Sequence, residues 1–258
     1  MSALPESGSS SERPGISKFD RLVVRNSLMN PHDLQFKIIP YAVGEGYAPY
    51  SEKYIAERIR LGGEKIPPET YSELVGDVAE QMLDDKFQHH ATHFLLFGES
   101  DAVNSKEFAA TSRFVKETSR RYTGLPNLES VRLVTPDKDD KWNSVIKKDS
   151  KYGELSRVVV PMGFRKQGFT TEIIQEMIDG ENGVIEIAMR EGIEYVLMVA
   201  QNRFSKYIEQ TKLEIVDKIP VTLRRAGRRV GRKYPGYWHD EDDKPKLIVT
   251  KVPQKQTA

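Results

Sequence analysis

The stretch from Gly153 to Ile178 constrains the fold of this chain more strongly than any other part. It includes Leu155 to Val160, an apolar run with three consecutive valines, which is typical of a strand buried on both faces. Pro161 ends this run, because proline cannot donate a hydrogen bond to a sheet. Apolar residues then return at the spacing of one helix face, at Ile173, Ile174, Met177 and Ile178. The pattern predicts a buried strand, a turn and an amphipathic helix.

The turn between this strand and helix is basic and contains a glycine. Such a turn at the start of a helix suits an anion, because free backbone N–H groups and the helix dipole point at the ligand. The spacing is neither that of a dinucleotide-binding loop nor that of a Walker loop. An ordinary turn with basic surface residues is the alternative. We predict a phosphate site formed by Arg165, Lys166, Gln167, Gly168, Phe169 and Thr170.

The same stretch resembles a known enzyme family. The spacing Arg165-x-x-Gly168-x-Thr170 resembles motif A of the GNAT superfamily of acyltransferases, although that family has glycine or alanine where Thr170 stands. The segment from Glu154 to Val160 is similar to the Glu-x-x-Arg strand of one branch, which contains autoinducer synthases, long-chain N-acyl amino acid synthases and exosortase-associated acyltransferases. The resemblance implies that the turn holds the pyrophosphate of coenzyme A or the phosphopantetheine of an acyl carrier protein.

Further short matches to this branch follow its order along the chain. Asp84 and Asp85 precede the strand-like run His93 to Phe97, as an Asp-x-x-Asp motif precedes a His-Leu-Leu strand in the branch. The run Ala109 to Val115 resembles the strand that carries an arginine, here Arg113. The remaining matches are Arg58 on an early helix, Leu125 to Glu129 and Gly231 to Pro235. The resemblance covers about residues 35 to 236.

The hydrophobic pattern predicts strands that alternate with helices in the second half of the chain. We expect strands at 34–40, 93–97, 107–116, 155–160, 195–200, 213–219 and 247–252, and helices at 50–61, 70–83, 173–178, 184–190 and 202–212. A loop is expected at 41–49, and a surface stretch at 130–150. This order favours an α/β (α+β) fold with a mixed central sheet covered by helices on both faces. The resemblance implies the GNAT-like form, in which two adjacent strands splay apart and admit the thioester arm.

Composition restricts the class of protein. The chain has 258 residues, of which 38% are hydrophobic and 30% charged, which suits a globular protein with a polar surface. We expect a disordered tail at 1–17 and one acyltransferase domain at 18–258. The lack of cysteine excludes disulfides, thiolate metal sites and a cysteine nucleophile. No apolar run reaches the roughly 20 residues of a membrane helix, and no secretory signal is visible, so we expect a cytoplasmic protein.

Three charged residues are the candidates for catalysis. Acyl transfer to an amine needs a deprotonated amine and a stabilised tetrahedral oxyanion. We assign Glu154 to positioning or deprotonating the amine, with a solvated strand-end glutamate as the alternative. Arg113 and Arg157 are the other two candidates, and a buried ion pair with Asp84, Asp85 or Glu129 is the alternative for Arg157. Side chains three residues apart on a regular strand point to opposite faces, so Glu154 and Arg157 can share one site only if a β-bulge intervenes.

Two other clusters have competing interpretations. His89, His90 and His93, with Asp85, suggest a metal site, but His93 is expected to begin a strand and the glutamate of a zincin motif is missing. We therefore expect no metal. Six basic residues lie between Arg224 and Lys233, and an acidic run follows them. They form either a solvated surface or a docking patch for an acidic acyl carrier protein. Nucleic acid is not the expected partner, because no aromatic residues interleave these basic residues.

Three functions are compatible with the sequence. The first is an N-acyltransferase that moves a fatty acyl group from acyl carrier protein or acyl-CoA to an amino acid or similar small amine. The second is an ordinary GNAT acetyltransferase that uses acetyl-CoA, and the third is a non-catalytic binding protein that uses residues 224–233. In the first two the thioester is a co-substrate, so no permanently bound cofactor is expected. A fatty acyl chain needs an apolar tunnel, for which the candidate lining residues are Phe94, Leu96, Phe114 and Met198.

Overall fold

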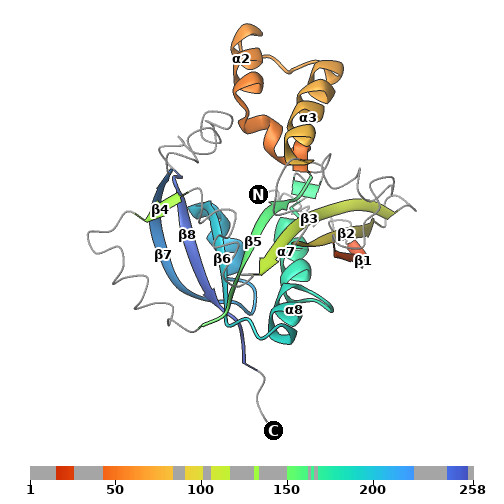
Figure 1. Ribbon diagram of the computed structural model, residues 1–258. Helices are drawn as coiled ribbons and strands as arrows, with labels where there is room; N and C mark the ends of the chain where they lie inside the picture. The colour runs from red at the N-terminus through yellow and green to blue at the C-terminus, as the bar shows by residue number, and fades with distance from the viewer. Residues whose placement is uncertain are drawn as a thin grey trace, which may run out of the picture.

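The protein folds around one mixed β-sheet (Figure 1). The computed structural model describes residues 16–25, 43–83, 91–100, 106–116, 131–133, 150–161, 164–165, 168–223 and 243–254. Eight strands in these ranges form a sheet in the order β1-β2-β3-β5-β6-β8-β7-β4. Their bounds are Ile16–Arg25 (β1), Ala91–Ser100 (β2), Lys106–Lys116 (β3), Val131–Leu133 (β4), Tyr152–Val159 (β5), Tyr195–Gln201 (β6), Glu214–Leu223 (β7) and Pro245–Lys251 (β8).

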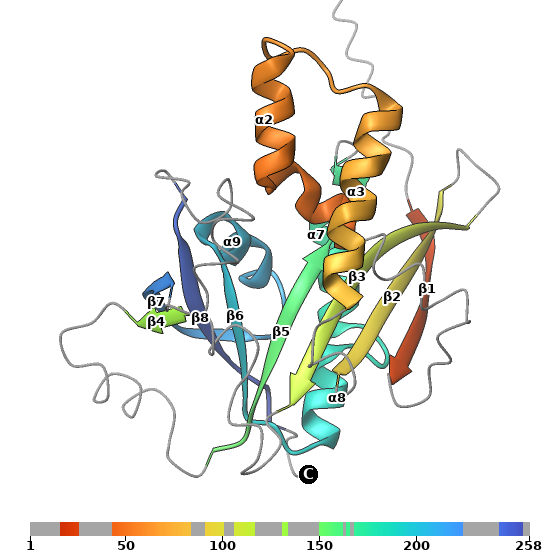
Figure 2. The same cartoon turned by 45° about the horizontal axis from the view of Figure 1, so that its top comes forward.

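Helices lie on both faces of this sheet. They are α2 (Glu52–Arg60), α3 (Pro68–Leu83), α7 (Thr170–Asp179), α8 (Val184–Arg190) and α9 (Ser205–Ile208), with 3-10 turns η2 (Ala48–Tyr50) and η4 (Asn202–Phe204). Figure 2 shows α2 and α3 in front of the sheet and α7 and α8 behind it. β5 and β6 are parallel, whereas the other neighbouring strands are antiparallel. The expected mixed sheet with helices on both faces is confirmed. None of the described helices is both long and apolar enough to cross a membrane.

The predicted strand–turn–helix unit builds the main core. Helix α7 buries the predicted apolar stripe, which consists of Ile173, Ile174, Met177 and Ile178. This stripe packs in one cluster with Leu155 of β5 and Val196 of β6. Fully burying an aliphatic side chain contributes about 1.5–3 kcal/mol, so the stripe fixes α7 across the parallel pair. Residues 180–183 interrupt the helix, as predicted, and α8 continues the cover.

Several elements differ from the sequence prediction. Residues 16–25 form an edge strand against β2, although the expected tail extended to residue 17. A helical turn at 43–47 continues into η2 where a loop was expected. Residues 131–133 form a short strand against β7, and the helix expected at 202–212 ends at Ile208. The expected strand at 34–40 lies outside the described residues. Tertiary pairing and packing override local composition at these places.

The segment 43–50 approaches β5 closely at Gly46. A Cβ atom at Gly46 would lie 2.6 Å from both Cγ atoms of Val159, which is far shorter than a van der Waals contact. The same segment is tied to α3, because Tyr71 Oη donates a hydrogen bond to the carbonyl of Glu45 at 3.4 Å. Glycine at this position therefore lets the segment lie directly over the end of β5.

Replacing Gly46 by alanine should destabilise the protein. The new methyl group overlaps Val159, and overpacking of this kind costs about 1–3 kcal/mol of unfolding free energy. Gly76→Ala is the matched control, since a Cβ there would meet nothing within 4 Å and alanine favours a helix interior by up to about 1 kcal/mol. Urea unfolding of both variants gives the comparison. A Gly46→Ala protein as stable as the wild type would contradict the close contact.

Candidate active site

β5 and β6 separate partway along their length. They pair at Tyr152 with Tyr195, at Gly153 with Val196 and at Glu154 with Leu197. Beyond these pairs β5 continues against β3, and β6 against β8. A cavity of about 370 Å³ opens between the two strands, lined by residues 155–160 on one side and 198–201 on the other. The segment 43–50, the start of α7 and the η4–α9 region complete its wall.

A β-bulge shapes the β5 side of the cavity. Arg113 pairs with Ser156, and the next ladder pair is two residues along β3 but three residues along β5. The extra residue is accommodated at Arg157, whose φ of 54° lies in the left-handed region that residues other than glycine rarely adopt. An extra residue changes which face the following side chains occupy. The bulge that Glu154 and Arg157 require in order to share one site is therefore present, and Arg157 lines the cavity.

Glu154 and Arg113 lie behind the cavity wall. Glu154 is 1% exposed and Arg113 is 3% exposed, and neither is among the described residues that line the cavity. Arg113 Nε donates a hydrogen bond to Ser156 Oγ at 3.1 Å across the β3–β5 ladder. The alternative of a solvated strand-end glutamate is thus wrong for Glu154. Of the three predicted catalytic residues, Arg157 is the one that reaches the cavity.

The predicted phosphate turn leads from the cavity into α7. Arg165 and Thr170 line the cavity, and Gly168 has a φ of 85°, which glycine adopts freely. The first backbone hydrogen bond of α7 runs from the N–H of Ile173 to the carbonyl of Phe169, so the amides of the first turn have no acceptor within the helix. The side chain of Phe169 packs in the main core. Arg165 and the N-terminus of α7 therefore give one end of the cavity a positive potential.

Glu45 lies near this basic end. Burial raises the pKa of Glu45, and the positive charge of Arg165 opposes that increase. Arg165 Nε is buried and has no hydrogen-bond acceptor among the described residues. Arg165 Nε is therefore a donor without an acceptor among the described residues, and Glu45 is its acidic neighbour.

Two tyrosines of the segment before α2 form a wall that the sequence prediction missed. Tyr47 and Tyr50 line the cavity. Burial raises the pKa of Tyr47, the positive charges of Arg157 and Arg113 lower it, and Tyr50 and Glu154 raise it. The phenol of Tyr47 therefore remains protonated at neutral pH. Tyr47 lines the cavity, and its phenol interacts electrostatically with all three predicted catalytic residues.

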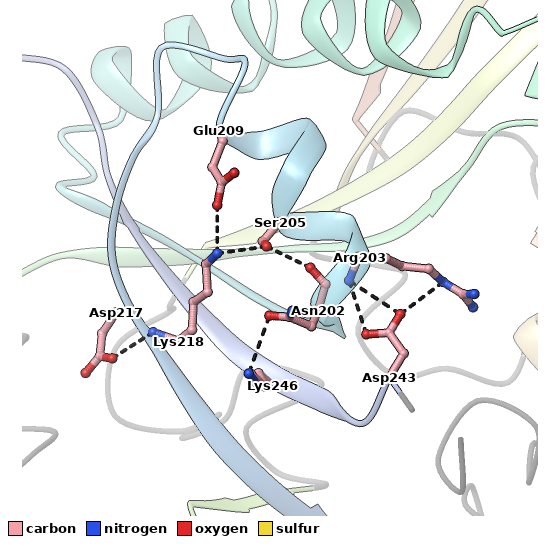
Figure 3. Close-up of polar contacts among 8 residues, drawn as sticks. All are labelled: Asn202, Arg203, Ser205, Glu209, Asp217, Lys218, Asp243 and Lys246. Atoms are coloured by element: carbon pink, nitrogen blue, oxygen red, sulfur yellow. Dashed lines mark hydrogen bonds and ion pairs between the residues drawn. The ribbon is translucent and has the colours of Figure 1, made fainter. Parts of the chain in front are cut away.

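Polar contacts from β7 and from Asp243, which precedes β8, hold the opposite wall in place. Figure 3 shows Lys218 of β7 donating to Ser205 Oγ at 2.8 Å and to Glu209 Oε1 at 2.7 Å. Asp243 accepts the backbone N–H of Arg203 at 3.1 Å and pairs with its guanidinium, with Nε and Oδ2 3.2 Å apart. This network fixes η4 and α9, which carry the cavity-lining side chains of this wall.

The candidate tunnel residues are distributed differently from the prediction. Met198 lines the cavity. Phe94, Leu96 and Phe114 are buried in the main core instead, because β2 and β3 turn these side chains toward α7. The prediction was wrong for these three residues, since alternation along a strand identifies a buried face but not the gap between two strands.

Several predicted site residues lie outside the described residues. They are Asp84, Asp85, His89, His90, Glu129, Lys166, Gln167 and residues 224–233. The metal alternative and the basic docking patch therefore remain sequence predictions. Within the described ranges, no group of three or more His, Asp or Glu side chains could hold a metal ion.

The geometry now identifies the fold. The resemblance implied two adjacent strands that splay apart, and β5 and β6 separate after three ladder positions. The predicted helix begins at the basic turn, and a bulge lies on the strand before that turn. The chain has a GNAT-like fold. No protein-family model and no curated protein matches the chain.

Solved structures with GNAT-type descriptions are similar to the chain. One is FeeM, an N-acyl amino acid synthase from uncultured soil microbes, with 10% identity over 91% of this chain and 89% of that chain and a TM-score of 0.39. Another is the AHL synthase LasI, with 10% identity over 92% and 91% and a TM-score of 0.41. A third is an N-acetyltransferase from Staphylococcus aureus Mu50, with 9% identity over 92% and 99% and a TM-score of 0.43. Since these scores lie below 0.5, the fold assignment rests on the geometry of the strands.

Glu45→Gln should gain stability relative to the wild type as the pH rises. Glu45 has an ordinary pKa of 4.5 and a higher value in this GNAT-like fold, so the unfolded chain ionises first. The wild type therefore loses stability as the pH rises through the folded pKa, whereas glutamine cannot ionise. Urea unfolding at about pH 4 and about pH 7 measures the difference between variant and wild type. A difference that is equal at the two pH values, or less favourable to the variant at the higher one, would contradict the burial effect.

Proposed function

We propose that this protein is an N-acyltransferase that moves a fatty acyl group from acyl carrier protein or acyl-CoA to the amine of an amino acid or similar small molecule. The observation that carries the proposal is the cavity between β5 and β6, with a basic turn and a helix N-terminus at its edge. The extended pantetheine arm of a thioester suits such a gap, because the backbone groups along two separated strand edges can hydrogen-bond its amides. Arg165 and the first turn of α7 bind its phosphate groups.

The acyl chain is assigned to the apolar part of the cavity. Ile174 from α7, Met198 from β6 and Phe204 from η4 line this part. Each methylene group buried there adds about 0.8 kcal/mol of binding free energy, so an apolar lining favours a fatty chain over an acetyl group. The segment from Glu154 to Val160 resembles the branch of the superfamily that uses fatty acyl groups. This resemblance also supports a fatty acyl chain as the transferred group.

The transfer proceeds without a covalent enzyme intermediate. The lone pair of the neutral amine attacks the thioester carbonyl carbon, which forms the C–N bond and a tetrahedral oxyanion. The oxyanion then collapses, the C–S bond breaks, the nitrogen loses its extra proton, and the departing thiolate takes up a proton to become the free thiol. The positive charge of Arg157 on the cavity wall stabilises the oxyanion. Glu154 and Arg113 set the local charge from behind the wall.

A thiol-release assay tests the proposal. Donors run from acetyl-CoA to hexadecanoyl-CoA, with the matching acyl carrier protein thioesters, and the acceptors are a panel of amino acids. We expect thiol release with long-chain donors and an N-acyl amino acid product by mass spectrometry. If acetyl-CoA were the only donor that is turned over, the protein would be an acetyltransferase and not a fatty acyltransferase. Absence of thiol release with every donor would overturn the enzymatic function.

Arg165→Gln tests the phosphate assignment. The variant loses a charge-assisted hydrogen bond, which is typically worth about 1.5–3 kcal/mol, so its Kd for coenzyme A should rise about tenfold or more. Arg190→Gln is the matched control, because Arg190 is an exposed residue at the end of α8 and not among the described lining residues. Isothermal titration calorimetry gives both affinities. Equal loss of affinity in the two variants would assign the effect to net charge instead of the site.

A further inference from the structure

Tyr47 has no role in the acyl-transfer steps above, although its position is central. It lines the cavity, whereas Glu154, the predicted residue for handling the amine, is enclosed behind the described part of the wall. The phenol of Tyr47 interacts electrostatically with Glu154, Arg113 and Arg157. Tyr207 lies across the cavity, packed edge-to-face on Phe204. Tyr47 is therefore a cavity residue that also interacts with the buried charged side chains.

The chain on either side of Tyr47 holds its backbone in place. The residue before it, Gly46, lies against Val159 so closely that no side chain fits between them. After η2, Ser51 Oγ donates a hydrogen bond to the carbonyl of Ala48 at 2.8 Å and closes the turn. A side chain whose backbone is fixed on both sides in this way can orient a ligand with a smaller loss of entropy on binding.

The charges of the cavity determine which form of the amine can bind. The charged side chains among the described lining residues are Arg157, Arg165 and Arg203, and all three are cationic. A positive environment disfavours an ammonium group and favours the neutral amine. A neutral amine that enters this wall still needs an acceptor for its N–H, because leaving it unsatisfied in a closed site costs binding energy. A neutral phenol oxygen supplies that acceptor.

We propose that the Tyr47 hydroxyl contacts the acceptor amine and orients its lone pair toward the thioester, and that Glu154 is a positioning residue that acts on Tyr47 from behind the wall. This inference rests on the proposed function. The two arginines beside Tyr47 favour the phenolate, and the carboxylate of Glu154 opposes them. Burial is the larger effect that keeps the phenol protonated, and Glu154 adds to it, so that the phenol oxygen can accept a hydrogen bond from a neutral amine.

Steady-state kinetics of Tyr47→Phe and Glu154→Gln provide the first test, with Tyr54→Phe as the matched control. Tyr54 lies on α2 beside Tyr71 and is not among the described cavity residues. Tyr47→Phe should lower kcat/KM for the amine about 10- to 100-fold and leave the KM for the thioester unchanged. Glu154→Gln should shift the alkaline limb of the pH–rate profile to lower pH, because the variant loses one of the charges that act with burial against the two arginines. Tyr54→Phe should match the wild type.

A spectroscopic measurement on the wild type does not depend on how well the variants fold. In protein labelled with 13C at tyrosine Cζ, the Tyr47 resonance is assigned by its loss in Tyr47→Phe. Addition of N-dodecanoylglycine, whose amide stands where the new bond forms, should shift the Tyr47 resonance and leave that of Tyr54 in place. Turnover by the wild type without a Tyr47 shift, or with unchanged kinetics in Tyr47→Phe, would overturn the role of Tyr47 while the proposed function stands. Absence of wild-type turnover with every donor would overturn both.

Discussion

β5 and β6 share three ladder pairs and then separate, and the cavity exists because each strand continues to pair on its outer side alone. In a continuous sheet the backbone groups of these strands would satisfy one another. After Glu154 the inner edges instead face a space lined by Leu155 to Val160 and by Met198 to Gln201. The bulge at Arg157 turns β5 away from its neighbour. The helices α7 and α8 join the two strands and keep them at this separation, because their apolar stripe packs across both.

The charges around the cavity are arranged in two layers. Cationic side chains lie on the wall, and acidic groups lie beside or behind them. Arg203 is paired with Asp243, and the positive charge of Arg165 acts on the nearby Glu45. Glu154 is enclosed by the strands. Such an arrangement suits the anionic thioester carrier of the proposed function, because the acidic groups offset part of the positive charge of the wall. In the proposed role, Glu154, with 1% exposure, acts on the amine through Tyr47 and not by direct contact.

The sequence predicts the scaffold better than the site. The apolar periods of β5, α7, α8 and β6 are strong, so these elements appear close to the predicted positions and the mixed sheet follows from their order. The need for a bulge also followed from the three-residue spacing of Glu154 and Arg157. Tyr47 could not be found in this way, because the glycines around it lower helix propensity and indicate a loop. Gly46 is instead needed for the close approach to β5. That approach depends on Val159, which lies more than a hundred positions along the chain. The misplaced tunnel residues Phe94, Leu96 and Phe114 have the same cause, since periodicity does not reveal where two strands part.

Hydrogen exchange measured by mass spectrometry, with and without coenzyme A, tests most directly whether the gap between β5 and β6 receives the thioester arm. The account predicts slower amide exchange in peptides covering 155–161, 168–174 and 198–203, where the two strand edges and the first turn of α7 line the cavity. It predicts unchanged exchange in β1 and in α8, which lie outside the described cavity lining. Protection confined to the basic stretch 224–233, with the strand edges unaffected, would contradict it.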